Sequence, residues 1–300
     1  MKNYILLIFL FSTTLSYAQK KGRIIDSTTK LPISYVNIWV ENEPEGTTSD
    51  ENGFFEFSKD YTTKTIVFSA IGYETKKIDW NSISETIVMD SEEIMLNEVV
   101  IHSKKETIES VIGNFKRSKI NKFFACGEKP KIWARYFPYK EKYSITPYLK
   151  QIKVFSISEN KNTKFNIRIY SIDSLGRPNK YLYSKNIIGI AKKGNKITKV
   201  DVSGFDISIP ENGFFIAIEW LIVDSNKYEY TYKEKGFKTK LTAIAYDPVF
   251  GTIAEETNEN SWEYIEGNWK KVEEDIFDDL KKKEKKRYSV LAIELTLSNE

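Results

Sequence analysis

The chain has 300 residues, with 45 Lys or Arg against 42 Asp or Glu and a formal net charge of +3. Such a balanced charge gives no basis for binding nucleic acid or an anionic membrane. The single cysteine, Cys126, excludes an intramolecular disulfide, so hydrophobic cores must hold the fold, and the length allows two of them. The 18 Tyr, 18 Phe and 6 Trp are typical of an all-β protein and argue against disorder.

Residues 1–18 are predicted to be a secretory signal peptide. Lys2 supplies the positive start, Tyr4 to Phe11 the apolar core, and Ser16-Tyr17-Ala18 a cleavage site before Gln19. This apolar stretch is too short to span a bilayer, and no later hydrophobic run is long enough to do so as a helix. We therefore expect an exported protein without a transmembrane span, located in the periplasm, at the outer membrane or outside the cell.

Residues 19–101 are predicted to form a seven-stranded or similar β-sandwich that folds alone. β-branched and aromatic runs alternate there with turns rich in Pro, Gly, Asp and Asn. Gly53 closes one such turn and is expected at positive φ, which glycine adopts without steric cost. Phe54 and Phe55 follow it and should point to opposite faces of a strand, so that one of them is buried.

The order of these motifs resembles the carboxypeptidase regulatory-like domain, a transthyretin-like sandwich without chemistry of its own. The matching motifs are G-x-I-x-D, L-P-x-x-x-V-N-I, T-T-S-D-E-N-G-x-F-x-F and F-S-x-I-G-Y, between Gly22 and Tyr73. The L-N-E-V-V-I segment after them is similar to the linker that follows this domain in TonB-dependent receptors and related Bacteroidetes envelope proteins. About 200 residues remain, too few for a receptor barrel, so the resemblance implies a smaller envelope or secreted protein.

A helical linker is predicted over residues 102–128. Its apolar residues recur near helical spacing, which indicates an amphipathic helix from Lys104 to about Asn121 that packs on a neighbouring sandwich. Gly113 interrupts it at a cost of about 1 kcal/mol. A membrane-surface helix is the alternative, disfavoured because the basic residues crowd one end and no Trp lies on the apolar side. The apolar residues are Ile108, Val111, Ile112, Phe115 and Ile120.

Residues 129–300 are predicted to form a jelly-roll-like antiparallel β-sandwich of about nine strands. In one strand Phe165, Ile167 and Ile169 alternate with polar or amphipathic neighbours, Asn166, Arg168 and Tyr170. The run from F-x-I-R-I-Y to E-N-G-F-F-I-A-I-E-W resembles a second domain of unassigned function in secreted Bacteroidetes proteins. The expected strands are Ile132 to Phe137, Gln151 to Ile157, Phe165 to Tyr170, Ile187 to Ile190, Thr198 to Val202, Phe214 to Val223, Tyr228 to Tyr232, Leu241 to Tyr246 and Tyr288 to Leu297.

Glu-Asn-Gly-Phe-Phe occurs twice, so Gly213 is assigned the same turn role as Gly53. One of Phe214 and Phe215 should accordingly be buried. Valine at either glycine should cost roughly 1–2 kcal/mol from the left-handed clash. Since the two glycines belong to separate predicted cores, each change should lower the melting temperature of its own domain alone.

No catalytic, cofactor or metal-binding residue is predicted. His102 is the only histidine, whereas a zinc carboxypeptidase site needs two His and a Glu, and Cys126 has no other imidazole to serve as its base. Cys126 is therefore expected to be a buried small side chain. Glu219 and Glu294 lie within apolar strands, pointing outward or pairing with Arg135 or Arg168, and a hydrolase with a carboxylate pair remains a further alternative.

Two binding alternatives rest on loops. Asp50, Asn52 and Asp173 offer oxygen ligands for calcium at loop ends, although a turn is the favoured interpretation of each. Trp262, Tyr264 and Trp269 lie in a polar hairpin and would form a glycan-stacking platform if exposed. The acidic run from Glu273 and the basic run that ends at Arg287 are expected to neutralise each other.

Together these observations predict an exported, non-catalytic cell-envelope protein that acts as a binding or structural interaction module. Its expected partner is an envelope protein or a cell-surface glycan, and not nucleic acid. The main alternative is a carbohydrate-binding protein that uses the C-terminal sandwich.

Overall fold

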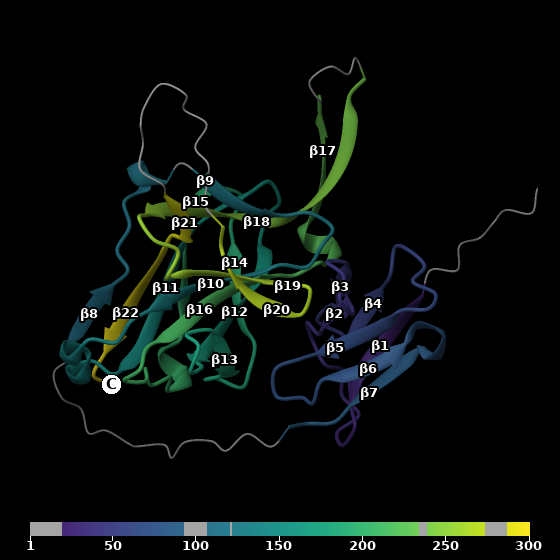
Figure 1. The fold of residues 1–300 in the computed structure, drawn as a ribbon, viewed down its shortest axis with the longest axis horizontal. Coiled ribbons are helices and arrows are strands. Elements are labelled where there is room, and N and C mark those ends of the chain that lie inside the picture. Colours follow the sequence, from purple (N-terminus) through teal and green to yellow (C-terminus); the bar gives the residue numbers. More distant parts are fainter. Residues whose placement is uncertain (1–19, 93–106, 121, 234–238, 274–286) are drawn as a thin grey trace, which may run out of the picture.

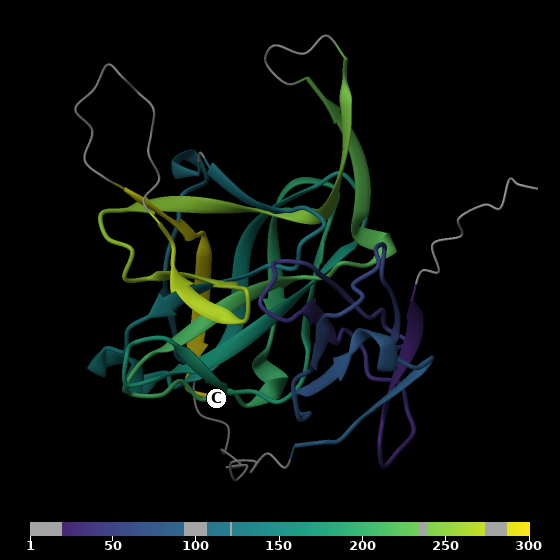
Figure 2. The ribbon, with the colours of Figure 1, turned by 45° about the vertical axis from the view of Figure 1, so that its right-hand side comes forward.

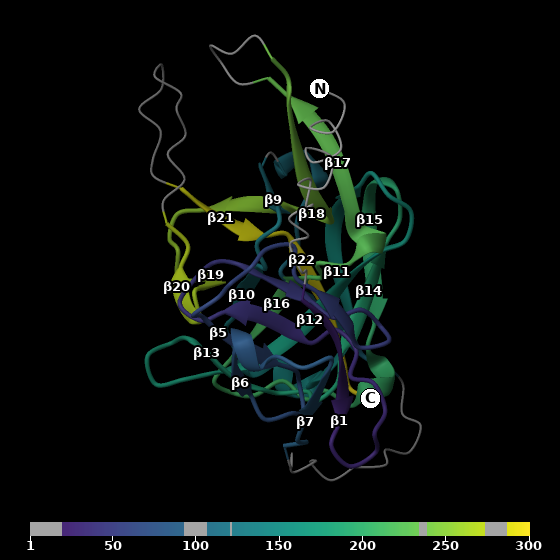
Figure 3. The ribbon, with the colours of Figure 1, turned by 90° about the vertical axis from the view of Figure 1, so that its right-hand side faces the viewer.

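The computed structural model describes residues 20–92, 107–120, 122–233, 239–273 and 287–300, and these are all-β, as predicted (Figure 1). Two β-sandwiches lie side by side, and Figure 3 looks onto the first with the sheets of the second behind it. Helical structure in the described residues is limited to short 3-10 turns. None of them is long and apolar enough to cross a membrane.

The first sandwich consists of a 3-stranded sheet, in the order β4-β1-β7, and a 4-stranded sheet, in the order β3-β2-β5-β6. Strand β1 is antiparallel to β4 and parallel to β7. Ile24, Ile38, Phe55 and Phe68 fill the space between the sheets. The strands are β1 (Lys21–Asp26), β2 (Asn37–Val40), β3 (Gly46–Thr48), β4 (Phe54–Glu56), β5 (Thr65–Ser69), β6 (Lys76–Asp79) and β7 (Thr86–Met89).

The turn into β4 is the one that the sequence predicts. Gly53 has φ +76°, and Asp50 Oδ1 accepts the backbone N–H groups of Asn52 and Phe54 at 2.8 and 2.9 Å. Phe55 is buried while Phe54 is 53% exposed. This alternation follows because only one side of the sheet faces the core.

The second sandwich consists of a 7-stranded and an 8-stranded sheet. The first follows the order β13-β12-β16-β10-β19-β20, with β14 also on β12. Its strands are β10 (Ile132–Phe137), β12 (Thr163–Ile172), β13 (Pro178–Tyr181), β14 (Ile187–Ala191), β16 (Phe214–Trp220), β19 (Ser261–Ile265) and β20 (Asn268–Lys271).

The 8-stranded sheet follows the order β17-β18-β11-β22-β8, with β15 on β11 and both β21 and β9 on β18. Its strands are β8 (Glu109–Ile112), β9 (Lys122–Cys126), β11 (Tyr148–Ser158), β15 (Gly194–Asp201), β17 (Lys227–Tyr232), β18 (Leu241–Glu255), β21 (Tyr288–Leu291) and β22 (Ile293–Ser298). The main core lies between the two sheets and includes Phe165, Ile218, Phe250 and Leu295.

The predicted linker helix is wrong where the structure describes it, in residues 107–120. Residues 109–112 are strand β8 beside β22, and Ile112 is buried opposite Leu295 while Val111 is 48% exposed. Gly113 has φ +73°, and a Cβ there would lie 2.6 Å from the Ile293 carbonyl oxygen. Pairing with the edge of β22 therefore overrides the local helical spacing. Residues 122–126 of the predicted linker form strand β9, and residues 102–106 and 121 lie outside the described residues.

The turn before β16 also follows the prediction, with Gly213 at φ +85°. The expectation for its two phenylalanines is wrong, because Phe214 and Phe215 are both buried. Phe214 faces the main core, whereas Phe215 belongs to a smaller core with Tyr170 and Trp262 on the other face of the sheet. Trp262 of β19 and Trp269 of β20, strands of the same sheet, contribute side chains to that second face.

One element leaves the body of the molecule. Strand β17 and residues 241–246 of β18 form a two-stranded ribbon that projects away from both sandwiches (Figures 1 and 2). We call it the ribbon.

Candidate interaction site at the seam between the sandwiches

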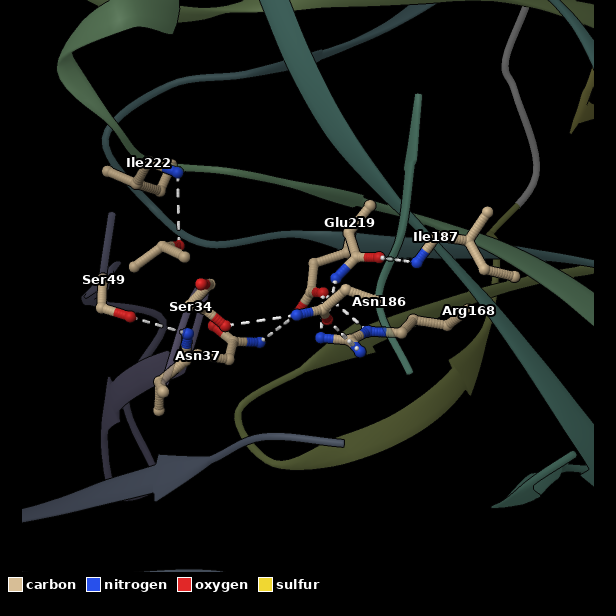
Figure 4. Close-up of polar contacts among 11 residues, drawn as sticks. Ser34, Asn37, Ser49, Arg168, Asn186, Ile187, Glu219 and Ile222 are labelled. Carbon is tan, nitrogen blue, oxygen red and sulfur yellow. Dashed lines mark hydrogen bonds and ion pairs between the residues drawn. The ribbon is translucent and has the colours of Figure 1, made fainter. Parts of the chain in front are cut away.

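A buried ion pair lies where the first sandwich meets the second, a contact surface that we call the seam (Figure 4). Glu219 on β16 and Arg168 on the neighbouring strand β12 are 3% and 2% exposed. Arg168 donates through Nε and Nη2 to Oε2 of Glu219 at 2.8 and 2.7 Å. Charge-assisted contacts of this kind are the strong class of hydrogen bond.

Side chains from both sandwiches complete the hydrogen bonding of this pair. Asn37 on β2 donates through Nδ2 to Oε1 of Glu219 at 2.9 Å. Asn186 accepts from Arg168 Nη1 at 2.9 Å and donates to the Ser34 carbonyl across the seam at 3.2 Å. A fully bonded polar network in a low-dielectric interior fixes the geometry of the groups that it joins. The network therefore holds the two sandwiches in one relative orientation.

Burial lowers the pKa of the Arg168 guanidinium, but the charge of Glu219, the neighbouring Tyr181 and Tyr170 and the hydrogen bond to Glu219 together outweigh burial, so the pKa is raised. Removing either partner would leave the other charge buried without its counter-ion.

Further contacts cross the seam on both sides of this network. Lys164 on β12 pairs with Glu51 and lies 3.3 Å from the hydroxyl of Tyr35. The hydrogen bond from Lys164 lowers the pKa of Glu51. On the other side, Trp39 and Tyr264 meet edge to face with ring centroids 6.2 Å apart.

An open cleft of about 1000 Å³ lies along the Lys164 side of the seam. Its walls carry charges of both signs together with aromatic rings, and Arg23 lies over the ring of Phe54 at 4.9 Å. Lining residues come from the first sandwich and from the base of the ribbon, and include Arg23, Glu51, Phe54, Asp224, Lys227 and Tyr246. The volume is within the range of ligand sites.

A second, smaller hollow of about 180 Å³ lies on the Trp39 side. Trp39, Pro44, Pro130 and Tyr264 are among its lining residues. Its apolar walls and small size suit one hydrophobic side chain of a partner.

The predicted glycan platform is not assembled as an exposed surface. Trp262 is 5% exposed and packs on Phe215, whereas Trp269 is half-buried against Tyr170 and Tyr264. The hairpin is polar in sequence but pairs with β10 through β19, which turns its aromatic residues onto the outer face of the 7-stranded sheet. Of the three residues, only Tyr264 reaches the seam.

The two acids that the sequence marks as unusual both have basic partners. Glu219 does not point outward but pairs with Arg168, which is the alternative that the sequence allowed, and Glu294 pairs with Lys153. Arg135 instead donates to the Leu291 and Ile293 carbonyls at 3.1 and 2.8 Å, with Glu255 3.7 Å away. Neither Glu219 nor Glu294 is therefore half of a carboxylate pair.

The aspartates considered as calcium ligands instead accept backbone hydrogen bonds within turns. Asp173 Oδ1 accepts the N–H groups of Leu175 and Arg177, each at 2.8 Å, in the way that Asp50 serves its own turn. In the part of the chain that the structure describes, no three His, Cys, Asp or Glu side chains gather as a metal site. His102, the predicted signal peptide and residues 274–286 lie outside the described residues.

Cys126 is buried on β9, and burial raises the pKa of its thiol to about 12. We expect native protein to resist alkylation by iodoacetamide from pH 7 to about 9, because thiolate is the reacting form. Mass spectrometry should find Cys126 unmodified in native protein and fully modified in denaturant. Rapid labelling of the native protein at pH 8 would contradict this burial.

The residues that carry the seam were largely missed by sequence reasoning. Asn37 lies in a motif that indicates only the family resemblance, Asn186 lies in no motif, and Arg168 was considered only as a partner for an acid. One signal was available, because Asn166 and Arg168 alternate with apolar residues in a strand whose two faces are both buried. A polar row on such a strand requires partners from another element.

Comparison with known proteins agrees with the N-terminal architecture. Residues 20–101 match the CarboxypepD_reg-like domain family. Such domains are non-catalytic. No curated protein sequence matches the chain.

Similarity to solved structures is weak. The cysteine protease and lectin-like domains of Cwp84, a surface layer associated protein of Clostridium difficile, have 9% identity and a TM-score of 0.35, over 57% of this chain and 32% of that chain. Clostridial cysteine protease Cwp84 after propeptide cleavage has 9% identity and a TM-score of 0.38, and the match covers 88% of this chain and 66% of that chain. The chain thus spans about a third of the first structure and 66% of the second. TM-scores this low do not indicate a common fold.

Proposed function

We propose that the protein is an exported, non-catalytic component of the cell envelope that binds another envelope molecule in the cleft at the seam. The observation that carries this proposal is the buried Arg168–Glu219 pair with Asn37, because it fixes both walls of the cleft. Because the walls of the cleft are already fixed, binding there does not incur the entropic cost of ordering the two sandwiches. The periplasm, outer membrane and exterior remain the proposed locations, in a bacterium of the Bacteroidetes type.

The mixed lining of the cleft supports an envelope protein as the partner. Side chains of both signs, such as Arg23 and Glu51, can pair with complementary charges, and Phe54 offers an exposed aromatic ring. Aromatic residues and Arg are enriched at protein interfaces. A glycan is the second candidate, favoured by Phe54 and Tyr246, whose rings could stack on sugars.

A hydrolase has less support than either binding role. Both oxygens of Glu219 are engaged by Arg168 and Asn37, whereas glycoside hydrolysis requires two carboxyl groups facing a substrate. Calcium remains a possible ligand of the exposed loops, but Asp50 and Asp173 already accept backbone hydrogen bonds there.

The test is affinity capture with residues 19–300 from an envelope extract and, in parallel, from purified envelope polysaccharide. We expect wild type to retain a partner and Phe54→Ala combined with Arg23→Glu to lose it by at least about tenfold. Leu175→Ala, a change at an exposed loop residue of the second sandwich, is the matched control and should bind like wild type. If the cleft variant retains the partner and has the melting temperature of wild type, the cleft is not the binding site. Retention from polysaccharide alone would favour the glycan.

A further inference from the structure

The ribbon carries an exposed strand edge away from the body of the molecule (Figures 1 and 3). Strand β17 pairs with β18 from Lys227 to Tyr232, and no described strand pairs with its other edge. An open edge is a template for another strand, and an isolated two-stranded ribbon is only marginally stable in water. Another strand can therefore pair with this edge, and the pairing would stabilise the ribbon.

The two faces of β17 differ sharply in character. Tyr228, Tyr230 and Tyr232 form a ladder on one face, with successive ring centroids 5.9 and 6.0 Å apart. Tyr230 and Tyr232 are 44% and 43% exposed. Tyrosine is a residue that protein interfaces favour, so this face is suited to a protein contact.

The other face carries Glu229 and Thr231, followed along the chain by Lys233. All three are exposed, and in the described part of the chain no ion pair involves Glu229 or Lys233. We propose that β17 pairs antiparallel with β17 of a second copy of this chain, about a two-fold axis at Thr231.

The charges favour this register over those with the axis at Tyr230 or Glu229. It places Glu229 opposite the second copy's Lys233, twice by symmetry, with Thr231 opposite itself. An axis at Tyr230 would oppose Lys227 and Lys233, and an axis at Glu229 would oppose two carboxylates. Opposite charges across strands stabilise a sheet and like charges destabilise it. Of these three axes, only the one at Thr231 avoids a like-charge pair among the described residues.

The same register unites the tyrosine ladders. Residues directly opposite in a sheet lie on one face, so Tyr230 meets the second copy's Tyr232, again twice. The result is a four-stranded sheet with six tyrosines on one face. Such an isologous contact closes on itself and limits assembly to a dimer.

A charge-swap experiment tests the register. Sedimentation of residues 19–300 over roughly 1–200 µM should show a monomer–dimer equilibrium. Glu229→Lys and Lys233→Glu should each weaken it by at least about tenfold, and the double swap should restore it to within about threefold. Lys180→Glu, an exposed change of equal charge on β13, should have no effect. A monomer throughout, or a dimer indifferent to both swaps, would overturn the proposal.

Crosslinking provides a measurement that does not depend on these charges. Thr231→Cys should form a disulfide dimer on mild oxidation, because the two copies of residue 231 are cross-strand neighbours within disulfide reach. Thr242→Cys on the adjacent strand β18 is the control, since strand spacing separates its two copies by about 14 Å. Buried Cys126 does not compete. Failure of Thr231→Cys to crosslink, or equal crosslinking of both variants, would contradict the two-fold axis at Thr231.

Discussion

Arg168→Ala should destabilise the protein by about 3–5 kcal/mol, because it leaves the Glu219 carboxylate buried without its counter-ion. The remaining hydrogen bond from Asn37 to Oε1 cannot replace the two contacts that the guanidinium makes with Oε2. Urea unfolding followed by tryptophan fluorescence would measure the loss. We expect the first contacts to fail at the seam, since both sandwiches contribute to the network there.

The matched control removes both charges. Replacing Arg168 by Met together with Glu219 by Leu should recover most of the lost stability, because a buried ion pair is often replaceable by apolar residues of similar volume. Asn37→Ala should cost less, about 1–3 kcal/mol, by leaving one carboxylate oxygen unsatisfied. A double variant as unstable as Arg168→Ala would mean that packing, and not charge, governs this site.

Gly53→Val should cost about 2–5 kcal/mol, the sum of the left-handed strain and a backbone clash. A Cβ at Gly53 would lie 2.5 Å from the Ile24 carbonyl oxygen, which belongs to the central strand of its sheet and cannot move aside. Gly213→Val should cost less, because the nearest atom, at 2.5 Å, is the Tyr136 hydroxyl at the end of a side chain, and the nearest backbone atom, the Phe137 carbonyl oxygen, is 2.9 Å away.

Gly176→Val is the control for these two changes. Gly176 has φ +79°, but a Cβ there would meet nothing within 4 Å. Its cost should therefore be the left-handed strain alone, roughly 1–2 kcal/mol. Equal effects at all three glycines would show that the close contacts contribute nothing.

The seam changes one expectation about these variants. If the two cores unfold independently, each substitution lowers the melting temperature of one transition only. The buried polar network between the sandwiches instead favours a single transition for the whole chain. Calorimetry of the full chain and of residues 20–101 distinguishes the two cases. If Gly53→Val shifts a single transition in the full chain, the sandwiches unfold together.

The sequence predicted the parts of this fold that depend on local rules. Residues 132–137 were expected as a strand and form β10 with the same bounds, because alternation and flanking turns are encoded nearby. The two Glu-Asn-Gly turns were likewise predicted from their own residues. In contrast, β8 has the apolar spacing of a helix and becomes a strand only because the edge of β22 is available.

The candidate site was largely beyond local rules. Asn37 and Glu219 are 182 positions apart and meet through the packing of two sandwiches. Nothing in the sequence around Asn37 specifies a distant carboxylate. Trp262 illustrates the reverse error, since a polar hairpin suggested exposure while pairing with β10 buried its aromatic ring.

The position of β22 has a consequence for synthesis of the chain. This strand, residues 293–298, lies between β11 and β8 in the 8-stranded sheet, although both neighbours are made much earlier. Until residue 298 has been translated, β11 and β8 have a vacant slot between them, and the second sandwich cannot close its core. The first sandwich, in contrast, has all seven strands by residue 89. A chain that emerges N-terminal end first should thus carry a folded N-terminal unit ahead of an open, aggregation-prone sheet that needs protection until β22 has emerged.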